Sequence, residues 1–276
     1  MKILQMADAV RYRTMTTEEL RETFVVRDLF EPGAIKLVYV DLDRTVIGSA
    51  VPTGAPLLLP TDDAFKAAYF TERRELGIFN IGGAGRVTVN GKDFEVPRLD
   101  ALYVGRGNEA IQFASADPAH PAEFYLLSYP AHTAHPIQPV RSGELDKVTL
   151  GSAEAANHRQ ITKLIHLAGA RSCQLVMGFT QLAPGSVWNT MPPHTHMRRS
   201  EVYLYFDVAP SDRVIHLMGP PQQTRNLVLA NKQAVVSPGW SIHAGVGTRN
   251  YSFCWGMGGE NQDYADMDGV AIAGLL

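Results

Sequence analysis

Residues 192–206 read PPHTHMRRSEVYLYF, and this stretch decides both the fold and the candidate site. Residues 201–206 have the alternation of an extended strand, in which successive side chains point to opposite faces. One face carries Glu201, Tyr203 and Tyr205, and the other face is wholly apolar. Neither pattern is typical of a solvated surface. We expect the polar face to line a ligand cavity and the apolar face to pack against protein.

Two histidines in this stretch, His194 and His196, have a spacing that suits metal binding. Side chains two apart on a strand point to the same face, so both rings can face one ion. Glu201 comes five residues after His196, the wrong parity for one continuous strand, so residues 197–200 must turn the chain and return the carboxylate as a third ligand. His243 follows a Pro-Gly turn and can supply the fourth.

Three imidazoles and one carboxylate form a donor set for a divalent metal ion. A His-x-His pair alone is weak evidence, because buried or surface histidines with ordinary hydrogen bonds also occur. The acid and the third histidine make the combination more specific. Nitrogen and oxygen donors without thiolate suit zinc, manganese, iron, cobalt and nickel alike. We expect one ion per subunit, held by His194, His196, Glu201 and His243.

The rest of the chain reads as short strands separated by turns, which favours an all-β protein. The order of parts in the first half, a strand, an Asn-Gly hairpin and a further strand, is similar to an order in the second half. The segments are residues 73–79, 86–96 and 101–107 in the first half, and residues 198–203, 227–229 and 234–239 in the second. We expect two jelly-roll β-barrel halves, residues 1–140 without metal ligands and residues 141–276 with them.

Two short peripheral helices are expected beside the barrels. Thr16 and Glu19 have the spacing of a capping box at the start of a helix over residues 16–26. Residues 62–70 are predicted to form the second helix.

Composition narrows the classes of function. A length of 276 residues is ample for a hydrophobic core, and the net charge of −3 without a basic stripe argues against a nucleic-acid partner. No apolar run is long enough for a membrane span, and the first apolar stretch is interrupted too early for a signal peptide. Cys173 and Cys254 lie in apolar runs and are expected to be buried free thiols, which favours a cytoplasmic location.

Three other motifs are less consistent with the rest of the sequence than the metal site is. The glycines of residues 82–85 lead into a hairpin, whereas a phosphate-binding loop needs a helix behind it. Residues 41–45, DLDRT, are similar to the nucleophile loop of haloacid-dehalogenase-type phosphatases, but those enzymes need a doubly wound fold. No Gly-x-Ser-x-Gly elbow of a serine hydrolase occurs.

The chain resembles the bicupins, and among them the 5-keto-4-deoxyuronate isomerases, also called 4-deoxy-L-threo-5-hexosulose-uronate ketol-isomerases. The likeness covers nearly the whole chain and is carried by residues 70–77 (FTERRELG), 80–85 (NIGGAG), 188–196 (WNTMPPHTH), 241–248 (SIHAGVGT) and 255–262 (WGMGGENQ). It implies zinc at the four ligands, a homohexamer, and a role in the catabolism of unsaturated uronates from pectin. Pro193 and residues 223–226 depart from the family's expected pattern. These departures bear on how the substrate is recognised and not on the metal ligands.

The implied reaction interconverts 4-deoxy-L-threo-5-hexosulose uronate and 3-deoxy-D-glycero-2,5-hexodiulosonate through an enediolate, whose negative charge a divalent cation stabilises. Glu260, Tyr203 and Tyr205 are the candidates for the group that moves the proton. Arg199 and Arg225 are the candidates for binding the substrate carboxylate.

Three other functions are compatible with the same residues. A 5-deoxyglucuronate isomerase of inositol breakdown is a close neighbour of the proposed activity. A manganese or iron oxygenase uses the same donor set on the same fold. A sugar-binding cupin without catalysis would bind uronate and show no turnover.

Overall fold

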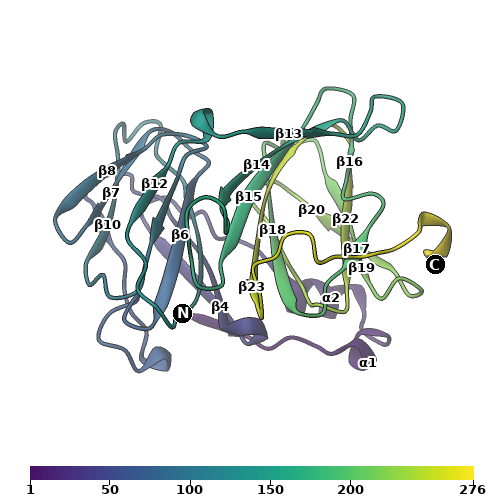
Figure 1. Ribbon diagram of the computed structural model, residues 1–276, viewed down its shortest axis with the longest axis horizontal. Helices are drawn as coiled ribbons and strands as arrows, with labels where there is room; N and C mark the ends of the chain where they lie inside the picture. The colour runs from purple at the N-terminus through teal and green to yellow at the C-terminus, as the bar shows by residue number, and fades with distance from the viewer. The chain divides into compact units, whose positions relative to one another are not determined.

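The computed structural model describes residues 1–276, which form mostly β-strands and two short α-helices (Figure 1). Two compact units divide the chain between them. The first unit contains residues 1–4, 28–145 and 164–176, and the second contains residues 5–27, 146–163 and 177–276. The prediction of an all-β fold is confirmed. No helix has the length and apolar character needed to cross a membrane.

The first unit holds a seven-stranded sheet and a four-stranded sheet. In spatial order the larger sheet contains β1 (Lys2–Leu4), β3 (Ile35–Val40), β4 (Thr45–Ala50), β11 (Phe124–Pro130), β6 (Arg74–Asn80), β9 (Ala101–Val104) and β12 (Gln138–Val140). The smaller sheet contains β5 (Leu57–Leu58), β10 (Ile111–Ser115), β7 (Gly85–Val89) and β8 (Lys92–Val96). β1 and β3 pair in parallel, and the other strand pairs of these two sheets are antiparallel.

The second unit repeats this arrangement. Its larger sheet contains β13 (Lys147–Leu150), β14 (Arg159–Ile165), β15 (Val176–Leu182), β23 (Ser252–Gly259), β18 (Arg199–Phe206), β21 (Ala234–Ser237) and β2 (Val25–Val26). Its smaller sheet contains β16 (Trp188–Asn189), β22 (Ile242–Gly247), β19 (Val214–Gly219) and β20 (Arg225–Leu229). A third sheet pairs only β17 (His194–Thr195) with β24 (Asp268–Gly269).

The sequence repeat is present, and its parts occupy equivalent places in the two units: β6 corresponds to β18, β8 to β20, and β9 to β21. In the first unit β7 and β8 form a hairpin whose turn residues, Asn90 and Gly91, both have positive φ, as a tight two-residue turn requires. Its counterpart is the hairpin of β19 and β20. Residues 227–229 and 234–237 lie in different sheets, because β20 pairs with β19 whereas β21 pairs with β18. Residues 94–96 and 101–104 of the first unit lie in different sheets in the same way, so the repeated segments are equivalent in the topology.

The chain divides between the units differently from a single cut near residue 140. Residues 5–27 belong to the second unit because β2 pairs with β21 there. Residues 164–176 belong to the first unit, where the carboxylate of Glu75 accepts hydrogen bonds from the backbone N–H groups of Cys173, Gln174 and Leu175 at 2.6–2.8 Å. Both assignments depend on contacts between segments far apart in the sequence, which a single cut in the chain cannot describe.

One of the two predicted helices is present. α2 (Thr17–Phe24) has Thr16 as its N-cap, and the reciprocal bonds between Thr16 and Glu19 complete the predicted capping box. The prediction of a helix over residues 62–70 is wrong. Only a 3-10 turn forms at Asp63–Phe65, and it ends at Lys66, which has the left-handed φ of 47°. A further short helix, α1 (Ala9–Tyr12), was not expected.

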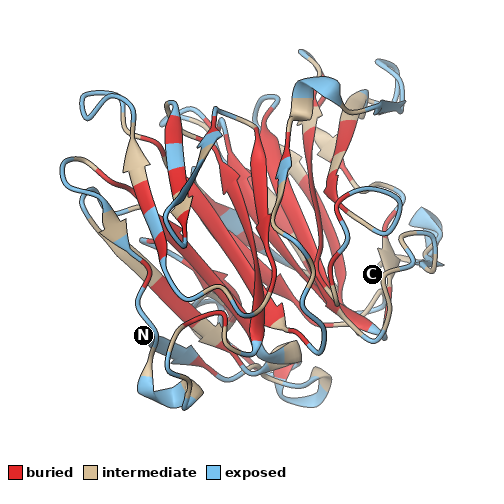
Figure 2. Cartoon of the chain, turned by 60° about the vertical axis from the view of Figure 1, so that its left-hand side comes forward, coloured by how far each residue is buried: buried red, intermediate tan, exposed pale blue.

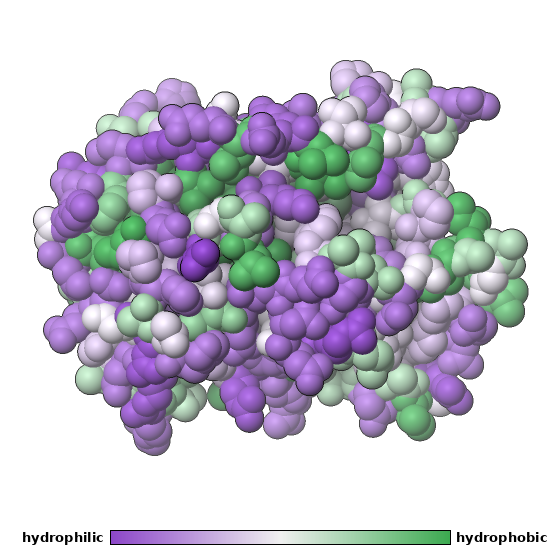
Figure 3. Space-filling view, viewed as in Figure 1, coloured by the Kyte–Doolittle hydropathy of each residue, from purple (hydrophilic) through white to green (hydrophobic).

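The strands carry most of the buried residues, and exposed residues concentrate in the connections (Figure 2). The face drawn in Figure 3 is largely hydrophilic, with hydrophobic side chains in separate patches. A cluster of apolar side chains forms the core of the first unit, and it includes Leu76 of β6 and Ile111 of β10. By their place in the topology these strands correspond to β18 and β22, which carry Glu201 and His243. The first unit therefore has apolar packing on the strands that bear polar donors in the second.

Candidate metal centre

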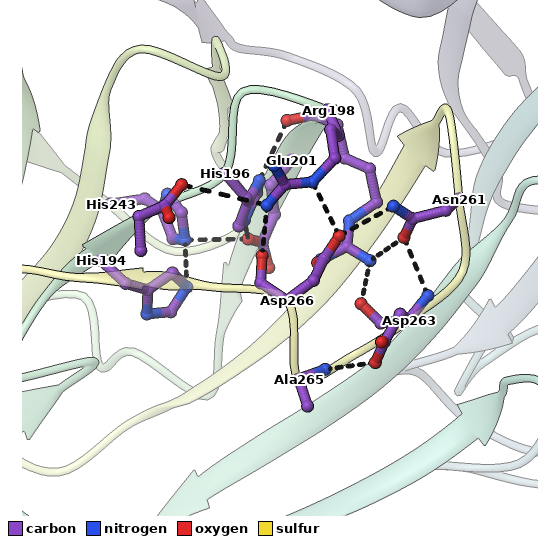
Figure 4. Close-up of polar contacts among 11 residues, drawn as sticks. His194, His196, Arg198, Glu201, His243, Asn261, Asp263, Ala265 and Asp266 are labelled. Atoms are coloured by element: carbon purple, nitrogen blue, oxygen red, sulfur yellow. Dashed lines mark hydrogen bonds and ion pairs between the residues drawn. The ribbon is translucent and has the colours of Figure 1, made fainter.

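Four side chains of the second unit converge at one point. His194 lies on β17, His196 follows that strand by one residue, Glu201 lies on β18, and His243 lies on β22. Each offers one donor atom, and these four atoms all lie within 4.8 Å of one another. Figure 4 shows the three rings and the carboxylate turned toward a common centre. The structure brings together the four residues that the sequence singled out.

The spacing of the donor atoms fits a divalent cation. Glu201 Oε2 lies 2.9 Å from His243 Nε2 and 3.0 Å from His196 Nε2. His243 Nε2 lies 3.0 Å from His194 Nε2. Two ligand atoms at right angles around a metal, each with a bond of about 2.1 Å, are separated by about 3.0 Å. The observed separations suit neighbouring ligands around one ion, and they are equally hydrogen-bond distances in its absence.

The hydrogen-bond partners of His196 are also compatible with a metal site. Its Nδ1 lies 3.0 Å from the backbone carbonyl oxygen of Arg199, so this nitrogen donates a proton to that oxygen. In the neutral ring Nε2 then carries a lone pair, and it faces the Glu201 carboxylate. Either a proton on Nε2 or a metal ion between the two groups satisfies this contact, and with the ring neutral Nε2 is available as a metal ligand. The outer nitrogen of His243 is likewise fixed, at 3.3 Å from Ser237 Oγ.

The electrostatics of the cluster are strongly coupled. Burial lowers the pKa of His194 to about 3, and the nearby His243 adds to this effect. Burial alone would raise the pKa of Glu201, but the charge of His243 and hydrogen bonds from His196 and His243 outweigh it and lower that pKa well below its ordinary value. An ionised carboxylate beside a neutral imidazole is the protonation state that binds a metal ion.

A cavity of about 240 Å³ opens beside His194 and Glu201. Alternate residues of five neighbouring strands, β13, β14, β15, β23 and β18, line it, so one face of the larger sheet forms its wall. The wall residues from these strands are Val148, Leu150, Arg159, Ile161, Lys163, Thr180, Glu201, Tyr203, Phe253, Trp255 and Met257. Thr190, Pro192, Tyr264 and Met267 complete the lining. Glu201 and Tyr203 of the polar face of β18 thus line a cavity, as the alternation predicted, whereas Tyr205 of the same face does not.

The three candidates for proton transfer occupy different environments. Tyr203 lines the cavity, and its hydroxyl lies 3.0 Å from Thr190 Oγ1. Tyr205 is fully buried outside the cavity lining, with its hydroxyl 2.8 Å from His216 Nδ1. Glu260 is exposed, and it is not among the residues that line the cavity. Of the three, the structure places only Tyr203 beside the candidate metal site.

The two arginines proposed for substrate binding lie outside the cavity lining. Arg199 has a fully buried side chain that forms an ion pair with Asp266 and donates to Asn261 Oδ1 at 3.2 Å. Arg225 donates to the backbone carbonyl of Met15. Figure 4 shows Asp266, Asn261 and Asp263 beside the four candidate ligands.

Sequence reasoning missed two basic residues that do line the cavity, Arg159 and Lys163. Both lie on the cavity face of β14, with Ile161 between them. The alternation Arg-x-Ile-x-Lys was visible in the sequence, but it did not reveal which face of the strand meets the ligand cavity.

The fold and the site define a two-barrel cupin with a candidate metal centre in one barrel. The model of the KduI/IolB family matches residues 24–271, so the chain belongs to that family. The chain is 53% identical over 264 residues to the 4-deoxy-L-threo-5-hexosulose-uronate ketol-isomerase of Shouchella clausii, covering 96% of each chain. It is 52% identical to the protein of that name from Lachnoclostridium phytofermentans, covering 94% of each.

Solved structures show the same fold at low sequence identity. An IolB-like protein from Salmonella typhimurium has a TM-score of 0.71 with 12% identity, covering 90% of this chain and 96% of that one. A Bacillus subtilis oxalate decarboxylase structure has a TM-score of 0.56 with 13% identity, covering 82% of this chain and 71% of that one. These likenesses support the cupin architecture alone.

Proposed function

We propose that the protein is a metal-dependent ketol-isomerase that interconverts 4-deoxy-L-threo-5-hexosulose uronate and 3-deoxy-D-glycero-2,5-hexodiulosonate. The observation that carries this proposal is the convergence of three imidazoles and one carboxylate beside a small cavity, which His194 and Glu201 line. Relatives about half identical over nearly the full chain bear the name of this activity. The proposal therefore rests on a site and on a family that point to the same chemistry.

The reaction moves a hydrogen from the hydroxyl-bearing carbon to the neighbouring carbonyl carbon, so that the carbonyl and hydroxyl groups exchange places. When bound at this site, a divalent cation supplies Lewis-acid polarisation of both oxygens and favours the negative charge that develops on them. His194, His196, Glu201 and His243 would hold it. We propose zinc as the ion because the resemblance implies it. The donor set by itself suits manganese, iron, cobalt and nickel equally.

Tyr203 is the residue that we propose to hold a proton beside the reacting oxygens. Burial raises the pKa of its phenol well above the ordinary value, and the negative charge of Glu201 raises it further. The phenol therefore stays protonated at neutral pH and can donate to a substrate oxygen in the cavity. Thr190, at 3.0 Å, fixes the orientation of this hydroxyl.

The wider setting follows from the same proposal. We propose a homohexamer that acts in the breakdown of unsaturated uronates from pectin. Both cysteines are free, which is compatible with a reducing, cytoplasmic environment. The prediction that both are buried holds for Cys254, whereas Cys173 is only partly buried.

The decisive experiment incubates the zinc-loaded protein with freshly generated 4-deoxy-L-threo-5-hexosulose uronate and follows the carbon skeleton by NMR. We expect conversion to the 2,5-diulosonate, its loss after treatment with a chelator, and its recovery with zinc. Parallel incubation with 5-deoxyglucuronate tests the inositol-pathway alternative, and oxygen uptake tests an oxygenase. A zinc-loaded, folded protein that leaves the deoxy-keto-uronate unchanged would contradict the proposal.

A further inference from the structure

Two basic side chains share the cavity wall with the candidate metal site. Arg159, Ile161 and Lys163 are alternate residues of β14, and all three line the cavity. In the antiparallel pairing with β13, Arg159 lies opposite Leu150 and Ile161 lies opposite Val148. These two β13 residues also line the cavity, so an apolar strand edge flanks the two cations. The register thus fixes both basic side chains on the cavity face.

Neither cation has a carboxylate partner in the protein. The one hydrogen bond of the Arg159 side chain runs from Nη1 to the backbone oxygen of Asn157, at 2.9 Å. Lys163 Nζ lies 4.1 Å from the centre of the Tyr264 ring, a cation–π contact that orients the ammonium group without neutralising it. By contrast, Arg198 and Arg199 both form ion pairs with Asp266.

The missing counter-charge matters because Arg159 is partly buried. Burial lowers the pKa of its guanidinium, which means that the charged form has lost hydration without gaining an anion inside the protein. A guanidinium has five N–H donors in a planar fork that matches a carboxylate. Most of these donors are free to bind an anion that enters the cavity.

The cavity therefore offers two kinds of binding group to one small molecule. A divalent cation held by His194 and Glu201 would attract carbonyl and hydroxyl oxygens, and β14 presents two positive charges on the same sheet face. We propose that Arg159 and Lys163 form the subsite for the carboxylate of a uronate, and so decide that the protein takes acidic rather than neutral sugars. This inference rests on the proposed function for the identity of the substrate, and it replaces Arg199 and Arg225 as carboxylate-binding residues.

Binding of stable sugars tests the subsite without turnover. Isothermal titration of the zinc-loaded protein compares D-galacturonate with D-galactose, which differ by the carboxylate. We expect galacturonate to bind the natural protein at least about tenfold more tightly, because a hydrogen-bonded charge pair contributes roughly that much or more. Arg159→Met and Lys163→Met should each remove most of this preference, and Arg159→Lys should retain part of it.

Lys147→Met is the matched control, because Lys147 is exposed on β13 and lies outside the cavity lining. This variant should keep the full preference for galacturonate. Thermal melting and zinc content of each variant establish that it is folded and loaded. If Arg159→Met does not fold, Lys163→Met alone carries the test. Equal binding of the two sugars, no binding of galacturonate, or an unchanged preference in the β14 variants would overturn the subsite.

Kinetics with the deoxy-keto-uronate separate this inference from the proposed function. If the subsite is correct, Arg159→Met raises KM by roughly tenfold to a hundredfold and changes kcat less. Isomerisation with an unchanged KM in that variant would reject the subsite and leave the function standing. A carboxylate preference that depends on Arg159, in a natural protein that does not isomerise the uronate, would reject the function and leave the subsite standing.

Discussion

Arg199 and Asp266, which are 67 residues apart, form an ion pair beside the candidate metal centre. The Arg199 side chain is 0% exposed and that of Asp266 is 17% exposed. Arg199 lies two residues before Glu201 on β18, and Asp266 lies two residues before β24. Because His194 pairs with Gly269 of β24, this ion pair connects the segments that carry two of the four candidate ligands.

Replacing Asp266 by Asn should therefore weaken both the fold and the metal site. The change leaves a buried guanidinium without its carboxylate, and we expect a loss of about 3 kcal/mol in the free energy of unfolding. The segment that contains β24 should loosen, so that His194 is less well positioned and zinc affinity falls. Denaturant unfolding and a competitive zinc titration measure the two effects.

Asp268→Asn is the matched control for this prediction. The Asp268 carboxylate is 65% exposed and lies 3.9 Å from Arg198, and an exposed pair at that distance contributes little. We expect its stability and zinc affinity to match those of the natural protein. If Asp266→Asn behaves in the same way as this control, the ion pair has no organising role.

Glu201→Gln tests whether the carboxylate is a metal ligand. Glutamine has nearly the same shape but lacks the negative charge, and it can present an N–H₂ group to the ion. We expect zinc affinity to fall by more than about a hundredfold, because even the groups that orient ligands contribute ten- to a hundredfold. Zinc content after dialysis, measured by atomic absorption, gives the result. Glu260→Gln should retain its zinc, since Glu260 is exposed and outside the cavity lining.

Tyr203→Phe removes the hydroxyl that we propose to hold a proton for the substrate. We expect kcat to fall about a hundredfold, the usual scale for a general acid, with KM changed far less. Tyr205→Phe provides the comparison, because its hydroxyl bonds to His216 and not to a cavity group. Steady-state kinetics on folded, zinc-loaded samples should show a large loss of kcat only for the Tyr203 variant. Equal losses in both would reject this role.

The four candidate ligands could be proposed from the sequence because their geometry is mainly local. His194 and His196 are two residues apart, and Glu201 returns after a short turn, so strand periodicity places three donors with little knowledge of the fold. The turn is shorter than expected, since β18 begins at Arg199 and includes two of the residues assigned to it. The placement of Glu201 survives this difference because its face is fixed by its parity with Tyr203.

The residues proposed to bind the substrate carboxylate could not be assigned from the sequence in the same way. Arg199 is an arginine close to the candidate ligands, and only the fold shows that Asp266 already pairs with it. Arg159 lies far upstream of the ligands, and it reaches the cavity because β14 joins the same sheet as β18. Local periodicity predicts which residues share a face, but it does not predict which strands become neighbours.

His216 is a buried histidine that the sequence did not distinguish. It lies on β19 with 0% exposure, and its Nδ1 shares a hydrogen bond of 2.8 Å with the Tyr205 hydroxyl. Its Nε2 has no hydrogen-bond partner within the protein. Burial lowers the pKa of His216 to about 3, and the nearby His243 lowers it further while the charge of Glu201 opposes this. The ring therefore stays neutral in the folded protein at pH values where it is protonated in the unfolded chain.

This difference predicts a specific loss of stability in acid. Between pH 6.5, the ordinary pKa of histidine, and about pH 3, His216 binds a proton in the unfolded chain but not in the folded protein. The contribution of His216 to stability is therefore fully present above pH 6.5 and is lost as the pH falls. The loss should approach about 1.4 kcal/mol per pH unit. His216→Asn keeps an acceptor near the Tyr205 hydroxyl and cannot be protonated. We expect its stability in chelator, measured by urea unfolding from pH 7 to about pH 4, to fall less steeply. His194 titrates in both proteins, so the difference between their slopes reports His216, and parallel curves would show that it contributes nothing.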